Sequence, residues 1–481
     1  MAKSIKVNFF YNMLLNVSKV IFPLITAPYV SRVLEPDGIG LYNFAIMYVG
    51  YFALFALLGV PTYGVREIAK IRDDKSKRNG FVSEIISIQF YLTILVTVVF
   101  LATLFFIPKL SSNLGIFLIA GISLYTSPFI IDWYYKGMEE FKFITQRSLI
   151  IKVLSIIALF IFVKTKADLI NYVILYSIAN VTNEVWNFLY LYKSGITPKL
   201  KVKGLKQHMK PLLVLFASSI AISIYTTLDT IMLGFISDYS EVGFYNNATH
   251  ITRSLLMAIS SLAIVAMPRI SYYMNQGKED EINSLVTKSV SVISFLAIPM
   301  MVALVLIAPT FIPLFFGQDF TGSILPMQLL SLLMITTGFN NLTGTQILLS
   351  IGKDKSFLYS VSAGTVSNFI LNLILIPSWG AVGASIASAF AEFMVLFMTI
   401  YYIKKETSVR VYNYSDTSKS LLSLIPMVVG YIICNYLFSG WLFVVSFTIV
   451  GSLFYILSQI AIKNKSALLF LNLVRNKIHK Q

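Results

Sequence analysis

The sequence predicts an all-α membrane protein, and three observations support that prediction. Hydrophobic residues make up 57% of the 481 residues and charged residues 12%, against about 45–50% and 25% in soluble domains. Apolar runs of about 20 residues, the length that spans a bilayer as a helix, recur along the whole chain. Lys and Arg gather in alternate connecting segments. We therefore expect fourteen transmembrane helices: two pseudo-symmetric six-helix lobes and two extra C-terminal helices.

The apolar runs define the predicted elements in chain order. The first run is not expected to be a cleaved signal peptide, because it is long and carries Asn12, Asn16 and Lys19. The predicted spans are 8–32, 40–63, 83–107, 114–135, 148–163, 168–192, 211–237, 244–268, 286–308, 322–350, 357–376, 381–403, 420–438 and 441–462. The predicted parts are an N-terminal lobe (1–200), a C-terminal lobe (201–410) and the last two helices with a tail (411–481).

The positive charges predict the orientation of these spans. With the amino terminus inside, 31 of the 38 Lys and Arg residues fall in inner segments, and only Lys109, Lys164 and Lys166 fall in outer loops. This distribution follows the positive-inside rule and predicts that both termini are cytoplasmic. The same rule accounts for the net charge of +16, so no nucleic-acid partner is expected. One cysteine and three histidines predict neither a disulfide framework nor a structural metal site.

An internal repeat supports two related halves. Residues 40–45 (GLYNFA) and 243–248 (GFYNNA) open the second and eighth spans, 203 residues apart. Halves of six spans in the same orientation are related by an axis along the membrane normal, and transporters built this way bind their substrate between the halves.

Polar side chains form a stripe along the first span. Asn8, Asn12, Asn16 and Lys19 recur at spacings of four, four and three, which places them on one helix face. Lys19 lies roughly 16 Å into the helix from Asn8 at 1.5 Å per residue, so we expect it to face a watery cavity and not lipid. Arg32, at the end of this span, either lines the cavity or lies among headgroups. Lys152 is expected to extend to the inner surface.

A second deep cation is predicted on the eighth span, where Asn246, His250 and Arg253 share a face. Two cations at corresponding places in the two halves favour an anionic ligand between them. The alternative is that Asp229 of the seventh span neutralises Arg253 in a structural ion pair.

Oxygen-bearing side chains suggest a cation site. Asn368 and Asn372 are four residues apart and share a face. With Asp229 they offer the hard oxygen ligands that an alkali cation prefers. A sodium ion or a proton would then be the coupling ion, and no other cofactor is expected. The alternative is that these polar groups only form interhelical hydrogen bonds.

Several motifs resemble the polysaccharide repeat-unit flippases of the MOP exporter superfamily, which carry O-antigen, capsule or teichoic acid precursors. The resemblance covers the whole chain, although Glu35 stands where that family usually has glycine. The motifs are residues 22–34 (FPLITAPYVSRVL), 35–40 (EPDGIG), 63–69 (YGVREIA), 132–137 (DWYYKG), 229–234 (DTIMLG) and 242–245 (VGFY).

The resemblance implies more than the composition does. It implies two six-helix lobes in a V, a central cationic cavity and alternating access in a bacterial cytoplasmic membrane. The implied substrate is an oligosaccharide linked through pyrophosphate to undecaprenol, with glycan-assembly enzymes as partners. Lys19 and Arg253, with Arg32, would bind the pyrophosphate. Asp229, Asn368, Asn372 and Ser388 fall near the sodium site of the related lipid II flippases, where Asn372 replaces a carboxylate.

Two other functions remain open. A cation-coupled exporter of small organic molecules would share the fold but would favour an acidic, aromatic cavity. A membrane polysaccharide polymerase or ligase would need catalytic groups on a large outer loop, whereas the longest predicted outer loop, 309–321, has only Asp319 as an ionisable side chain. No phosphate-binding G-x-x-x-x-G-K-[ST] loop is present, which argues against an ATP-driven pump.

Overall fold

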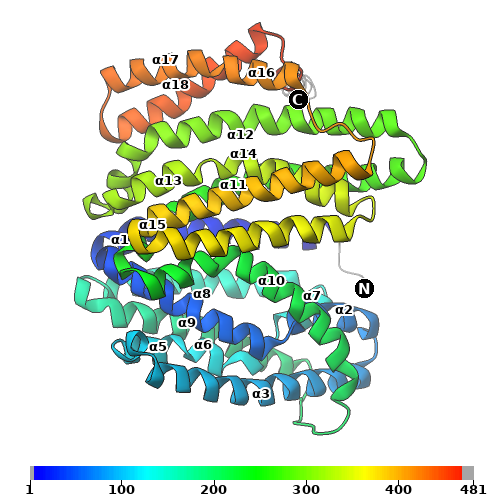
Figure 1. Ribbon diagram of the computed structural model, residues 1–481. Helices are drawn as coiled ribbons and strands as arrows, with labels where there is room; N and C mark the ends of the chain where they lie inside the picture. Colours follow the sequence, from blue (N-terminus) through cyan, green and yellow to red (C-terminus); the bar gives the residue numbers. More distant parts are fainter. Residues whose placement is uncertain (1–4, 469–481) are drawn as a thin grey trace. The chain divides into compact units, whose positions relative to one another are not determined.

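The computed structural model describes residues 5–468, without the side chains of residues 5, 258, 260–268, 274 and 275. These described residues form helices and connecting turns, with no strand among them. The chain divides into two compact units, Met1–Phe235 (unit 1) and Ile236–Gln481 (unit 2), which Figure 1 colours from blue to green and from green to red. The prediction of an all-α protein is therefore confirmed.

Unit 1 is built from long apolar helices joined by short ones. The predicted span 114–135 is broken into four short helices, one of which contains Pro128. The helices are α1 (Ile5–Leu57), α2 (Val60–Ile71), α3 (Lys75–Phe106), α4 (Pro108–Ser111), α5 (Leu114–Ala120), α6 (Ile122–Tyr125), η1 (Ser127–Phe129), α7 (Asp132–Gly137), α8 (Phe141–Phe162), η2 (Lys166–Asp168), α9 (Leu169–Lys193) and α10 (Lys206–Ile236).

Unit 2 has the same character. Its segment Asn341–Leu349 is a π-helix, a local departure from α geometry that is rare in proteins. The helices are α11 (Tyr239–Asn275), α12 (Glu279–Phe316), η3 (Gln318–Ser323), α13 (Ile324–Leu330), α14 (Leu333–Asn340), η4 (Asn341–Leu349), α15 (Asp354–Glu406), α16 (Tyr414–Leu422), α17 (Leu424–Leu437) and α18 (Gly440–Ala461).

Eight helices of the described residues are long and apolar enough to cross a membrane, or nine if the bent pair Gln318–Leu330 and Leu333–Leu349 forms one span. Two of them, α1 and α15, are each 53 residues long and contain one non-helical residue, Glu35 and Gly380 respectively. Each break separates two of the predicted spans. The count of fourteen stays a prediction.

The two breaks have different backbone geometry. Glu35 has φ 58° and ψ 176°, a region occupied almost only by glycine. Gly380 has φ 47°, and a Cβ atom at this position would collide with the Glu241 carboxylate. Glu241 Oε2 instead accepts a hydrogen bond from the backbone N–H of Ala381 at 2.6 Å. Glycine at position 380 therefore makes room for an acidic cap on the second half of α15.

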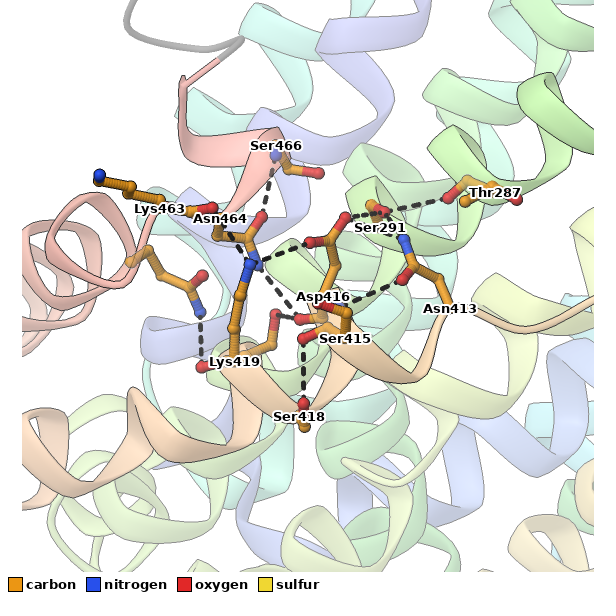
Figure 2. A network of polar contacts seen from close by, with 12 residues as sticks. Thr287, Ser291, Asn413, Ser415, Asp416, Ser418, Lys419, Lys463, Asn464 and Ser466 are labelled. Carbon is orange, nitrogen blue, oxygen red and sulfur yellow. Dashed lines mark hydrogen bonds and ion pairs between the residues drawn. The ribbon is translucent and has the colours of Figure 1, made fainter.

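A polar network attaches α16 to the neighbouring helices of unit 2, as Figure 2 shows. The Asp416 carboxylate is buried and accepts hydrogen bonds from the Ser291 hydroxyl of α12 at 2.7 Å and from Asn413 Nδ2 at 2.9 Å. Asn464 Nδ2, just beyond α18, donates to the Asp416 carbonyl at 3.1 Å. Lys419 Nζ lies 3.8 Å from the same carboxylate. We call Ser291, Asn413, Asp416 and Asn464 the Asp416 clamp.

Candidate functional site

The polar stripe predicted on the first span is present on α1. Asn12, Asn16 and Lys19 are all exposed on unit 1, and Lys19 Nζ donates a 3.4 Å hydrogen bond to Asn16 Oδ1. Their common face follows from the helical spacing. That this face borders a watery cavity stays a prediction.

A second cation, Lys152 of α8, lies beside this stripe. Its ammonium donates to the Ser18 hydroxyl at 2.9 Å and lies 5.3 Å from the centre of the Phe22 ring. Ser18 precedes Lys19 in α1, and the Lys19 and Lys152 charges interact electrostatically. The sequence predicts that Lys152 extends along α8 to the inner surface. In the structure its side chain reaches toward α1 instead. We call Lys19 and Lys152 the lysine pair.

The two lysines interact electrostatically, and neither of the two hydrogen bonds given above is to a carboxylate. This location is therefore electropositive. The ammonium groups contact an amide oxygen and a hydroxyl, which orient them without neutralising them. Such a location attracts an anion, and lysine is a common partner of phosphate.

Arg32 lies farther along the same helix. It is exposed and lies three residues before the break at Glu35. Thirteen residues of helix separate it from Lys19, or roughly 20 Å at 1.5 Å per residue.

The corresponding stripe in unit 2 lies on α11. Arg253 is exposed, whereas Asn246 and His250 are half-buried. Asn246 Nδ2 donates to the Val242 carbonyl at 2.9 Å. His250 Nδ1 has no hydrogen-bond partner among the residues that the structure describes. Whether Arg253 binds a ligand or pairs with Asp229 stays open, because Asp229 belongs to unit 1.

The four residues predicted to hold a cation are divided between the units. Asp229 is buried in α10 of unit 1, whereas the other three lie on α15 of unit 2. Asn372 Nδ2 donates to Asn368 Oδ1 at 3.1 Å, which confirms that these two share a face. The Ser388 hydroxyl lies 3.0 Å from the Tyr245 hydroxyl. The four-residue cation site stays a prediction.

Two of the sequence motifs contact each other in unit 1. Gly64 of α2 leaves room for the Trp133 indole, which a Cβ atom at position 64 would overlap. Gly137 lies in the same way against Ile68. These contacts fix α7 against α2 and thereby place Asp132, the first residue of α7. The motifs at 63–69 and 132–137 thus form one packing unit.

Asp132 belongs to a buried ionic cluster that the sequence did not predict. Arg147 of α8 is almost fully buried, and its Nη2 atom lies 3.1 Å from Asp132 Oδ1. Asn187 Nδ2 of α9 donates to the same oxygen at 2.7 Å. The predicted span 148–163 leaves Arg147 in the preceding inner segment, whereas α8 begins seven residues before residue 148 and includes Arg147.

Comparison with known proteins identifies the family. Residues 5–274, more than half of the chain, match the profile of the family described as "Polysaccharide biosynthesis protein". The chain belongs to this family. Residues 215–374 also match the MatE profile. The resemblance to the MOP superfamily inferred from the motifs is confirmed.

Similar proteins align with most of the chain. The "Putative O-antigen transporter" of Escherichia coli K12 is 24% identical over 404 residues, 83% of this chain and 97% of that protein. The "Capsular polysaccharide biosynthesis protein CapF" of Staphylococcus aureus is 20% identical and covers 83% and 99%. An inward-facing multidrug resistance MATE transporter of the MOP superfamily matches with a TM-score of 0.60 at 15% identity, over 81% of this chain and 96% of that one. This last likeness establishes the fold.

Proposed function

We propose that this protein flips an undecaprenyl-pyrophosphate-linked oligosaccharide, a precursor of polysaccharide or teichoic acid, from the inner to the outer leaflet by alternating access. The observation that supports this function most directly is the lysine pair on α1 and α8. Relatives named as an O-antigen transporter and as glycan flippases support the same class of substrate.

The chemistry of the lysine pair suits a pyrophosphate. Each phosphate unit carries negative charge and acceptor oxygens, which two neighbouring ammonium groups would contact together. Hydrocarbon excludes such a group because its lost hydration is not replaced. Fixed cations and the amides of Asn12 and Asn16 would replace that hydration, while the lipid tail remains in the bilayer.

The remaining cations would act at other points of the path. Arg32, roughly 20 Å from Lys19 along α1, would receive the pyrophosphate after the lysine pair releases it. Arg253, with His250 and Asn246, would present a second cationic surface from unit 2. This order makes Lys19 and Lys152 the entry site.

The driving force needs no nucleotide. An inside-negative membrane potential favours outward movement of an anion by about 2.3 kcal/mol per charge per 100 mV. A sodium ion held by Asp229, Asn368, Asn372 and Ser388 would couple a second gradient to the same cycle. The proposed location is a bacterial cytoplasmic membrane, with both termini inside and glycan-assembly enzymes as partners.

Export of small organic molecules is the second candidate, and the likeness to a MATE transporter favours it. An exporter of organic cations would present carboxylates and aromatic rings to its substrate. Helix α1 also exposes Phe9 and Phe10, but it has no carboxylate before Glu35, and its exposed polar side chains include Lys19. We therefore place the lipid-linked oligosaccharide first.

Reconstituted protein tests this function. In proteoliposomes that contain a lipid-linked oligosaccharide, we expect outward flipping to be measurable and to fall about tenfold or more in K19A or K152A, because each removes a charged contact to phosphate. The matched control is K70A, since Lys70 is exposed and pairs with Glu67 on the surface. Undiminished flipping in both lysine pair variants would contradict the assignment of the site.

A further inference from the structure

The cluster around Asp132 contains a second carboxyl group with a different environment. Glu184 of α9 has only 8% of its surface exposed. Its Oε2 atom is buried and has no hydrogen-bond partner within residues 5–468 as described. Glu184 lies one helical turn before Asn187, which donates a 2.7 Å hydrogen bond to Asp132. Asp132 and Arg147 both act on Glu184 electrostatically, and the Thr126 side chain hydrogen-bonds to it. No role for Glu184 follows from the substrate site.

The charges of the cluster do not balance if both acids are ionised. Arg147 already lies 3.1 Å from Asp132, so this pair is neutral as a unit. An ionised Glu184 would add one negative charge, buried beside the carboxylate of Asp132. Burial of an unpaired ion costs several kcal/mol, whereas a neutral carboxyl avoids that cost.

A metal cation does not suit this location. The Arg147 guanidinium would repel it, and the described residues contain no group of three or more potential metal ligands from His, Cys, Asp and Glu. A proton needs only the carboxyl itself. Asp132, whose side chain is 37% exposed, is the member of the cluster that reaches the surface of unit 1.

The guanidinium offers a second arrangement. Arg147 Nη2 contacts Asp132, whereas its Nε and Nη1 atoms are buried and make no hydrogen bond to any described residue. These N–H groups could bind a carboxylate. A rearrangement that brings these N–H groups to Glu184 would stabilise its ionised form.

We propose that Glu184 is a proton-binding site of unit 1. It holds a proton while Arg147 is paired with Asp132, and it releases that proton to water when Arg147 turns toward it. Only the O–H bond of the carboxyl breaks, and the electron pair stays on Glu184. The use of this proton in transport rests on the proposed flippase function; the binding of the proton does not.

Infrared difference spectroscopy of the full-length protein in lipid nanodiscs tests the site. We expect a protonated-carboxyl band whose intensity changes with pH and is lost in E184Q. The matched control is E392Q, because Glu392 is equally buried at 8% exposure but accepts hydrogen bonds from Asn340. A titrating band that persists unchanged in E184Q would overturn the proposal.

The neighbours provide a second measurement in case E184Q folds poorly. D132N removes a negative neighbour and should move the titration midpoint of the Glu184 band to lower pH. R147Q removes the positive neighbour and should move it to higher pH. A titration midpoint that stays the same in both D132N and R147Q would also overturn the proposal. Because no transported substrate is used, that result would leave the flippase proposal intact.

Discussion

Glu35 carries a backbone conformation that glycine adopts at much lower cost. Its φ of 58° and ψ of 176° lie in a region where a side chain adds about 1–3 kcal/mol of strain. The break that it makes in α1 separates the cation stripe from the following helix. Its carboxylate pairs with Lys166 Nζ, an exposed pair whose contribution is small. The backbone conformation at Glu35 thus explains why the family usually has glycine at this position.

We expect E35G to raise the free energy of unfolding by about 1 kcal/mol, because relief of strain exceeds the lost surface pair and the added flexibility of glycine. E35A should not be stabilised, since it loses the pair and keeps the strain. Thermal unfolding in detergent measures both. Equal stability of the two variants would contradict this interpretation.

The sequence predicted some site residues and missed others for a physical reason. The exposed stripe of Asn12, Asn16 and Lys19 follows from helical spacing alone. Lys152 and Arg147 were misplaced because long cationic side chains can extend several ångströms in either direction, and because the start of α8 was predicted too late. A hydrogen-bond partner on another helix, such as Ser18 for Lys152, can be identified only once the fold is known.

At the scale of elements, glycine positions decide how helices approach. Gly64 lets the Trp133 indole pack against α2, and in the same unit Gly234 of α10 leaves room for Phe44 of α1. The motifs that contain residues 64, 133 and 234 therefore include residues that pack helices against one another. The sequence identified the motifs but did not indicate that they touch, because the partners are distant in the chain.

We predict that G64A destabilises the protein by about 1–3 kcal/mol, because the added methyl overlaps a buried ring that cannot move freely. The matched control is G50A, also within a helix, where an added Cβ meets no described atom within 4 Å. That change should be neutral or stabilising. Thermal unfolding of both variants measures the difference, and equal effects would refute the packing argument.

The Asp416 clamp should fix α16 to α12 and to the end of α18. D416A removes the carboxylate that accepts from Ser291 and Asn413, and the loss of these charge-assisted hydrogen bonds should cost about 1–3 kcal/mol. Ser291 can still donate to the Thr287 carbonyl, and Asn413 to the Ser291 hydroxyl. We expect faster hydrogen exchange in α16–α18 and little change in unit 1. S418A is the control, because Ser418 is exposed and its one hydrogen bond within residues 5–468 is to the Ser415 carbonyl. Unchanged exchange in D416A would show that the clamp contributes nothing.

At the scale of the whole molecule, composition and apolar runs were enough to predict an all-α membrane fold, and the motifs were enough to predict the family. The broken segment around Pro128 and the π-helix at Asn341–Leu349 were not predictable, because apolar length does not distinguish a straight helix from a bent one. Asp229 lies in the first compact unit and Asn372 in the second, so their predicted meeting depends on the arrangement of two units.

Binding of a short-chain polyprenyl pyrophosphate to the purified protein tests most directly whether the lysine pair holds the substrate's charged head. We predict that wild-type protein binds this probe, that K19A and K152A each weaken binding about tenfold or more, and that K70A binds normally. High salt should weaken wild-type binding. Wild-type affinity in the K19A/K152A double variant would contradict the central claim.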